Sequence, residues 1–324
     1  MAKQPRSRLR DLGEYLFVRA TECLLWPLPL SGIRAFGRFM GWLTWRLDRR
    51  HRVVAEENAA WALGLGPAEA RKLVRRVYRN SGMTSAECLM LPHILRRYRI
   101  ADLSRYEGVE HLKKALAKGR GVIFLTAHIG NWELGGLALA EQSGGKLLSI
   151  ARTLDNPLLE RHLSRIRHQL GQTVVDRKGA LRHIIQAVRA GGVVGLLIDQ
   201  NQRKDGVFVD YFGRLASTTP SAAVIALRYD VPVIAGYAVR GADGKFEMHC
   251  DPPFELIRTG DTEKDVLANT AMFTQRIEEW VRRFPDQWAW LHSRWRTRPE
   301  EEKRALKAQR AAQAAAALSG APSP

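Results

Sequence analysis

Residues 120–135, which read RGVIFLTAHIGNWELG, decide the fold. The run at 122–127 is short, apolar and preceded by a glycine, which is typical of a buried strand. The residues after Trp132 are rich in Leu, Ala and Gly and predict a helix. A strand, a turn and a helix in this order form the repeating unit of α/β proteins, which place their functional residues after the strand ends.

The same pattern of a short apolar run followed by a helical stretch recurs along the middle of the chain. Three further apolar runs predict strands at residues 147–151, 193–198 and 231–239. Amphipathic stretches at 156–170 and 179–190 predict crossover helices, and further helices are expected within 56–99 and from 260 to 284, where Pro285 ends the last one. The sequence therefore predicts an α/β fold with a mixed, largely parallel central sheet flanked by helices.

Three regions are expected in the 324 residues. Residues 1–54 form an N-terminal, membrane-interacting helical segment, in which Leu-, Phe- and Trp-rich stretches are interrupted by arginines and the net charge of residues 1–52 is +7. An amphipathic helix pair packed on the body of the protein is the alternative interpretation. Residues 55–298 form the α/β domain, and residues 299–324 form a charged, then Ala-rich, C-terminal tail.

The chain is strongly basic, with 51 Lys and Arg against 33 Asp and Glu and a formal charge of +18. Such a charge favours nucleic acid, anionic lipid or a phosphorylated substrate as partner. The basic residues are scattered and form no recognised nucleic-acid motif, so we expect no nucleic-acid partner. The cysteines and histidines lack ligand spacing, and no glycine-rich phosphate loop is present, so neither a metal nor a cofactor is expected.

His128 and Glu133 lie five positions apart, directly after the first predicted strand. If the histidine lies on the turn and the glutamate on the first helical turn, the carboxylate could fix the imidazole tautomer and stabilise its protonated form. The spacing also occurs by chance, and single histidines are often structural. Asn131 between them is equally compatible with a helix cap.

The hexapeptide HIGNWE resembles the signature of the lipid A biosynthesis lauroyl/myristoyl acyltransferases, within the lysophospholipid acyltransferase superfamily and its His-x4-Asp/Glu motif. Further segments are similar to that family, in order and at similar spacing, and the resemblance covers about residues 35–297. These segments are 107–112, 119–121, 151–152 with 156–158, 199–200, 206–209 with 211–213, and 285–295.

The resemblance implies that His128 removes the proton from an acceptor hydroxyl, which attacks an acyl thioester, while Glu133 orients and electrostatically supports His128. Arg152 would stabilise the oxyanion or bind an acceptor phosphate, or else lie on the surface without such a role. Backbone amides around Gly130 are the other candidate oxyanion donors. Asp199 and Gln200 end the third predicted strand and are expected at the same sheet edge, where they shape the pocket or cap a turn. Asn131 completes the expected substrate-binding set.

The donor implied by the resemblance is an acyl-carrier-protein thioester, and the acceptor is a lipid A precursor. The expected location is the inner membrane, with the catalytic domain on the cytoplasmic side against anionic lipids. An alternative within the superfamily uses acyl-CoA and a phosphatidylinositol mannoside or another glycolipid or lysophospholipid. A non-catalytic nucleic-acid-binding or membrane-scaffolding protein is the alternative from another class.

Overall fold

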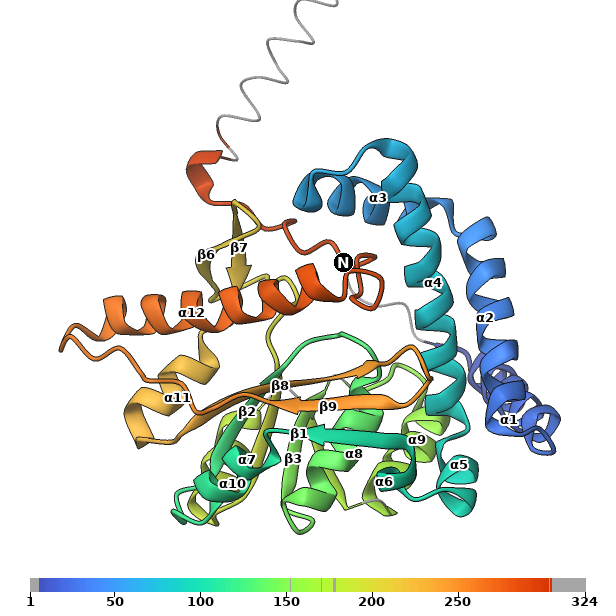
Figure 1. Ribbon diagram of the computed structural model, residues 1–324, viewed down its shortest axis with the longest axis horizontal. Helices are drawn as coiled ribbons and strands as arrows, with labels where there is room; N and C mark the ends of the chain where they lie inside the picture. Colours follow the sequence, from blue (N-terminus) through green and yellow to red (C-terminus); the bar gives the residue numbers. More distant parts are fainter. Residues whose placement is uncertain (1–5, 152, 170, 177–178, 303, 305–324) are drawn as a thin grey trace, which may run out of the picture.

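A seven-stranded sheet lies at the centre of the molecule, in the order β1-β9-β8-β2-β5-β3-β4 (Figure 1). The computed structural model describes residues 6–151, 153–169, 171–176, 179–302 and 304. The strands of this sheet are β1 (Ser104–Glu107), β2 (Val122–Thr126), β3 (Leu147–Ala151), β4 (Gln172–Asp176), β5 (Val193–Leu197), β8 (Val233–Arg240) and β9 (Phe246–Cys250).

Most neighbouring strands of the sheet run parallel. The exception is β9, which is antiparallel to β8 and parallel to β1. The mixed, largely parallel sheet flanked by helices that the sequence predicts is therefore confirmed. Strands β2 and β5 are parallel neighbours in which Thr126 pairs with Leu197, so the residues that follow the two strands meet at one edge.

Helices cover both faces of the sheet. Successive side chains of a strand point to opposite faces, and those of β2 divide accordingly. Val122 and Phe124 pack in the cluster formed with α7 and α8, while Ile123 and Leu125 pack in the larger core formed with α10, α11 and α12. The helices are α7 (Val109–Leu116), α8 (Trp132–Gln142), α9 (Pro157–Gln169), which packs on β4, α10 (Ala180–Arg189), α11 (Ser221–Tyr229) and α12 (Thr262–Arg283).

From residue 6 onward, where the described part of the chain begins, six helices precede β1. They are α1 (Arg8–Leu25), α2 (Leu30–Leu47), α3 (Arg49–Leu63), α4 (Pro67–Leu89), α5 (Leu91–Arg97) and α6 (Ile100–Leu103). Helices α2 and α4 cross closely because glycines face one another: a Cβ on Gly41 would clash with the Tyr78 carbonyl oxygen, and one on Gly82 would clash with that of Gly37. The boundary expected after residue 54 falls inside α3.

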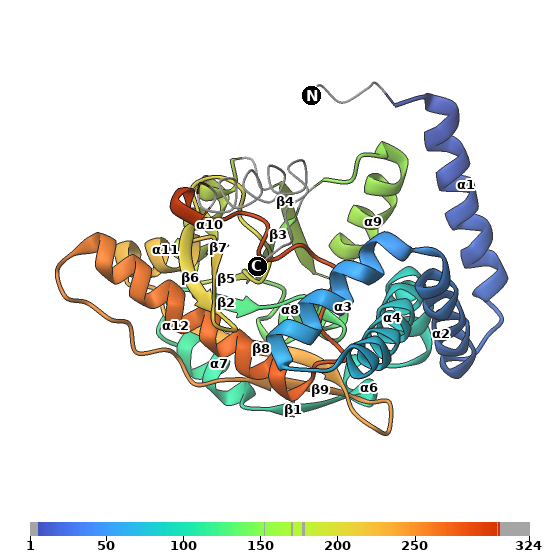
Figure 2. The ribbon, with the colours of Figure 1, turned by 90° about the horizontal axis from the view of Figure 1, so that it is seen from above.

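Helix α1 lies at the outer edge of the molecule, next to α2 and α9 (Figure 2). Its contact with α9 includes a hydrogen bond of 2.7 Å between Glu22 Oε1 and His162 Nε2. Among the described residues, no helix combines the length and apolar character needed to cross a bilayer.

Some elements were not predicted from the sequence. The hairpin of β6 (Val207–Tyr211) and β7 (Arg214–Thr218) packs on α12, and β1, β4 and β9 extend the sheet at its two sides. These five strands have four or five residues each and mix polar with apolar side chains, so their apolar signal is weak. The C-terminal tail expected at 299–324 lies mostly outside the described residues.

Candidate active site

His128 lies on the turn after β2, and its ring is held by Asp199 from the turn after β5. The imidazole Nδ1 is 2.8 Å from Asp199 Oδ1, and the backbone N–H of His128 donates to Asp199 Oδ2 at 2.8 Å. The two residues lie two positions beyond the paired residues Thr126 and Leu197, so the strand register brings them together. One carboxylate thus fixes both the backbone and the ring of His128.

The surroundings of this pair shift both pKa values. Burial alone would lower the pKa of His128, but the charge and hydrogen bond of Asp199, with a smaller coulombic contribution from Glu133, outweigh it and raise the pKa. Burial alone would raise the pKa of Asp199, yet His128 and a hydrogen bond from Trp288 lower it to about 2. Asp199 is therefore ionised at neutral pH and stabilises the protonated imidazole.

The second ring nitrogen of His128 faces away from Asp199. The ring donates from Nδ1 to the ionised carboxylate, which leaves an acceptor lone pair on Nε2. The amide Nε2 of Gln200 lies 3.2 Å from this atom, at the distance of a hydrogen-bond donor. The side chain of His128 is 23% exposed, and Nε2 is its ring nitrogen on the side away from Asp199.

Asp199 is held in turn by Trp288, whose indole Nε1 donates to Asp199 Oδ2 at 2.8 Å. Trp288 is buried, and its neighbour Ala289 donates its backbone N–H to the His128 carbonyl oxygen at 3.1 Å. The sequence predicted no role at the site for the Trp288 side chain. Clustered aromatic residues such as Trp288 are more often core residues, and only the fold shows that this indole N–H meets a carboxylate.

The expected contact between Glu133 and the His128 ring needs correction. Glu133 instead forms a two-pronged ion pair with Arg167 of α9, in which Arg167 Nε lies 3.1 Å from Glu133 Oε2 and Nη2 contacts Oε1. Glu133 is the second residue of α8, and its side chain reaches Arg167 of α9, whereas Asp199 takes the place beside the ring. Arg167, which the sequence did not single out, joins the site.

Asn131 caps α8 and is not exposed to a bound molecule. Its Oδ1 accepts the N–H of Leu134 at 3.0 Å, its Nδ2 donates to Glu87 at 2.9 Å, and the residue is 1% exposed. The sequence allowed a helix cap as one interpretation of Asn131, and the structure shows that cap. The expected substrate-binding residue Arg152 lies outside the described residues.

The turn between His128 and Asn131 is tightly bound by its neighbours. Gly130 has a φ of 62°, and a Cβ there would clash with the carbonyl oxygen of Ala238, so only glycine fits. The amide of Gly130 donates to the Gln287 carbonyl at 2.9 Å, and that of Asn131 donates to the Ala238 carbonyl at 2.8 Å. Both of these amides therefore donate to carbonyl groups of the fold and are not free to bind an oxyanion in this arrangement.

A largely apolar cavity lies between α8 and the sheet, beside the turn. Its empty volume is about 900 Å³, open mouth included. Glycines at positions 135, 136, 195 and 236 leave space along its walls, and Phe124, Leu139 and Met248 supply apolar surface. Trp132, Glu133 and Arg167 also line it, and the Trp132 ring lies 5.2 Å from the His128 ring, so the cavity reaches the neighbourhood of His128.

The described residues contain no cluster of three His, Cys, Asp or Glu side chains able to hold a metal ion. The site that the strand ends assemble is thus an imidazole with an ionised carboxylate behind it and an apolar cavity alongside. A buried carboxylate that is hydrogen-bonded to Nδ1 of a partly exposed imidazole is the arrangement of a general base.

Comparisons with known proteins show which family the chain belongs to. Residues 3–297 match the family described as bacterial lipid A biosynthesis acyltransferase. The chain is similar to the lipid A biosynthesis lauroyltransferase of Escherichia coli K12, with 27% identity over 86% of this chain and 90% of the relative. It is 26% identical to the palmitoleoyltransferase of that strain over the same shares. It is 26% identical to the phosphatidylinositol mannoside acyltransferase of Mycobacterium tuberculosis H37Rv, over 77% of this chain and 78% of the relative. The chain therefore belongs to the bacterial lipid A biosynthesis acyltransferase family and is an acyltransferase.

Proposed function

We propose that this enzyme transfers a fatty acyl group from an acyl-carrier-protein thioester to a hydroxyl of a lipid A precursor, at the cytoplasmic face of the inner membrane. The observation that carries the proposal is the partly exposed imidazole of His128, which buried Asp199 holds at Nδ1 and which lies 5.2 Å from the ring of Trp132 in the cavity wall. An alcohol is a poor nucleophile at neutral pH, and a positioned base accelerates such a transfer by about 10²- to 10⁴-fold.

The reaction proceeds by direct transfer. His128 Nε2 takes the proton of the acceptor hydroxyl as its oxygen bonds to the thioester carbonyl carbon, and Asp199 stabilises the resulting imidazolium. The carbonyl oxygen becomes negatively charged, and Arg167, which lines the cavity while paired with Glu133, is the cation that we propose to stabilise it. Collapse of the tetrahedral intermediate breaks the carbon–sulfur bond, and the imidazolium returns its proton to the leaving thiolate.

The cavity beneath α8 suits the hydrocarbon chain of the donor. Its walls are mainly apolar, and burying each methylene group of a chain there stabilises binding by about 0.8 kcal/mol. Trp132 and Glu133, which line the cavity, belong to the same turn-and-helix segment as His128. A chain lying in the cavity would therefore hold its thioester carbonyl beside the imidazole, which favours a fatty acyl donor over a small acyl group.

Exposed apolar residues on α1 and α2 support contact with a membrane surface. Leu9, Leu12, Leu16 and Phe17 recur at the spacing of one helical face, and Phe17 is 72% exposed. On α2, Phe39 and Leu47 are exposed as well. Helices with an exposed apolar face and basic flanks lie in the headgroup region of a bilayer rather than crossing it.

A cluster of arginines near these helices supports an anionic surface as the partner. The guanidinium carbons of four arginines lie between 5.3 and 5.8 Å from the ring centroid of Trp45, and that of Arg46 also lies 5.3 Å from the ring of Trp42. The four are Arg46, Arg52, Arg71 and Arg75. Arg46, Arg71 and Arg75 are exposed, so the cluster presents positive charge to solvent. Anionic headgroups attract such residues by about 1 kcal/mol each.

The decisive experiment pairs two donors with two acceptors. Purified protein is incubated with lauroyl or palmitoyl thioesters of acyl carrier protein or CoA, and with a lipid A precursor or a phosphatidylinositol mannoside, and the products are identified by mass spectrometry. We expect acylation of the lipid A precursor from the carrier-protein donor, and loss of that product in His128→Ala. Acylation of the mannoside from acyl-CoA alone would assign the enzyme to the other substrate class. Normal activity of a folded His128→Ala variant would overturn the mechanism.

A further inference from the structure

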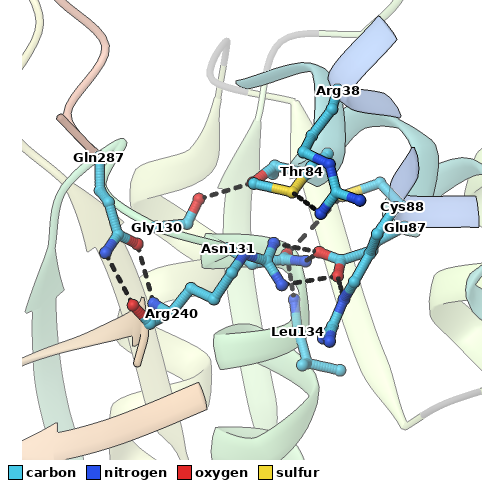
Figure 3. Close-up of polar contacts among 11 residues, drawn as sticks. Arg38, Thr84, Glu87, Cys88, Gly130, Asn131, Leu134, Arg240 and Gln287 are labelled. Atoms are coloured by element: carbon cyan, nitrogen blue, oxygen red, sulfur yellow. Dashed lines mark hydrogen bonds and ion pairs between the residues drawn. The ribbon is translucent and has the colours of Figure 1, made fainter. Parts of the chain in front are cut away.

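Glu87, on the last turn of α4, is a buried carboxylate that binds three other elements. The residue is 2% exposed. Its Oε1 accepts from Arg34 Nε of α2 at 2.6 Å and from Arg240 Nη1 of β8 at 2.7 Å. Its Oε2 accepts from Arg240 Nη2 at 2.6 Å and from Asn131 Nδ2 at 2.9 Å (Figure 3). Four charge-assisted hydrogen bonds therefore meet on one side chain outside the apolar cavity.

The contact with Asn131 reaches the turn that carries His128. Asn131 caps α8 through its Oδ1, so the orientation that Glu87 imposes on the amide also sets the start of α8. One helical turn before Glu87, Thr84 Oγ1 donates to the Gly130 carbonyl at 3.0 Å (Figure 3). Helix α4 thus holds two consecutive residues of the turn, only two and three positions after His128.

The contact with Arg240 reaches the other side of the same turn. Gln287 bonds both backbone groups of Arg240 through its side-chain amide, at 2.8 and 2.9 Å, and its carbonyl accepts the N–H of Gly130. The next residue, Trp288, binds Asp199. Glu87 is therefore connected to the base through Asn131 and to its carboxylate partner through Arg240 and Gln287.

This ionic network adds more than helix packing requires. The crossing of α2 and α4 is already determined by the facing glycines, and apolar residues surround it. Burying a carboxylate with two arginines is costly unless its geometry is well satisfied, and such networks select one arrangement over its alternatives. The arrangement that this network selects is that of the His128 turn.

We propose that Glu87 is a positioning residue of the transfer reaction, which acts through Asn131 to keep His128 aligned with Asp199 and with the cavity. This inference rests on the proposed role of His128 as the base. Glu87 touches no part of the apolar cavity, so its removal should affect the rate at saturation and not the binding of the acyl chain.

Two variants test the two ends of the contact. Glu87→Gln keeps the shape of the side chain and removes its charge. Asn131→Ser keeps an oxygen acceptor for the cap of α8 but removes the donor to Glu87. A misplacement of about 1 Å costs up to roughly 10²-fold in rate, so we expect kcat to fall about 10- to 100-fold in both, with KM for the acyl donor little changed.

Asp251→Asn is the matched control. Asp251 is also a buried carboxylate, 5% exposed, and it accepts from Arg276 Nε at 2.8 Å and faces His249 at 2.9 Å, with no contact to the turn at 128–131. We expect this control and Glu87→Gln to lower Tm alike, as loss of a buried ion-pair partner does. At a temperature well below each Tm, only Glu87→Gln and Asn131→Ser should lose kcat.

The pH profile gives a readout that loss of stability alone would not change. Asp199 raises the pKa of His128, and a misaligned ring would feel it less. The acid limb of kcat/KM should therefore move to lower pH in Glu87→Gln and Asn131→Ser and stay in place in Asp251→Asn. Wild-type kcat and pH profile in Asn131→Ser, or an equal loss of kcat in the control, would overturn the inference. An active His128→Ala variant would instead remove the proposed function itself.

Discussion

Two carboxylates lie near His128, and their surroundings differ. Asp199 is buried at the end of a central strand and gives its oxygens to His128 and Trp288. Glu133 lies on the first turn of α8, partly exposed beside the cavity, and gives its oxygens to Arg167. Asp199 therefore holds the ring directly, whereas Glu133 acts on it through space.

The two carboxylates therefore have different tasks beside the same turn. A carboxylate hydrogen-bonded to Nδ1 selects the tautomer and stabilises the imidazolium as it forms. A carboxylate paired with arginine contributes less charge at the imidazole, but it holds α8 to α9 beside the cavity in which we propose the acyl chain lies. Variants that remove the charge of Asp199 or of Glu133 should separate the orientation of His128 from the contact between α8 and α9 beside the cavity.

The largest effect is expected for Asp199→Asn. An asparagine of the same shape can donate to Nδ1 and so turn the ring toward the wrong tautomer, which in comparable sites lowers kcat by up to about 10⁴-fold. We expect a loss of about 10²- to 10⁴-fold with KM for the donor changed far less, measured by steady-state transfer to the lipid acceptor. Trp288→Phe removes only one hydrogen-bond donor to Asp199 and should therefore lose less activity. Equal activity of Asp199→Asn and the wild-type enzyme would show that Asp199 does not orient the base.

The second effect is a shift of the pH profile. The base works in its neutral form, so activity falls as pH falls through the pKa of His128. Since that pKa is raised, the acid limb of kcat/KM in the wild-type enzyme should lie above the ordinary value of 6.5. In Asp199→Asn the stabilising charge is lost, and the residual activity should show its acid limb at lower pH. A limb that stays in place would mean that another group titrates.

A smaller loss is expected for Glu133→Gln. Its charge contributes less than Asp199 to the raised pKa of His128, but its removal leaves Arg167, whose side chain is 14% exposed, without a partner at the cavity. We expect kcat/KM to fall about tenfold, in keeping with a lost electrostatic interaction rather than a lost base. Arg167→Gln removes the same ion pair together with the charge that we propose for the oxyanion, so it should lose more activity than Glu133→Gln. A loss in Glu133→Gln as large as that of His128→Ala would reverse the division of tasks.

The sequence predicted four of the seven strands of the sheet and the place of His128 after the first of them. Strands β2, β3, β5 and β8 consist of apolar runs bounded by glycine or polar residues, which is a strong local signal. His128, Asp199 and Gln200 could be placed at one sheet edge because each follows such a run. The short strands β1, β4 and β9 lack this signal, because each carries polar or charged residues within four or five positions.

The partners of each side chain could not be predicted in the same way. The five-residue spacing between His128 and Glu133 suggested a contact, but whether a carboxylate meets the ring depends on the direction of α8 after Gly130 turns the chain. Trp288 and Glu87 lie far from the turn in the sequence, and they reach it only through the packing of α4 and of the segment at 285–290. Contacts of this kind are long-range, and no local pattern encodes them.

The smallest effect should be on the length of the acyl chain that the enzyme prefers. Gly195 of β5 lines the cavity, and a Cβ there would meet Leu147 Cδ1 at 3.4 Å, an ordinary contact, so a small side chain fits the fold but takes volume from the cavity. Each methylene excluded from burial costs about 0.8 kcal/mol, or roughly fourfold in binding. We therefore expect Gly195→Val to shift the preferred acyl donor toward chains about two carbons shorter, with kcat on the shorter donor changed by only a few-fold, as read from product masses in a mixture of donors.

Leu196→Val is the control. Leu196 is the next residue of the strand and packs in the core on its opposite face, so this variant should lower stability without changing the chain-length preference. An unchanged preference in Gly195→Val would place the acyl chain elsewhere and leave the base without the neighbouring cavity that the division of tasks assumes.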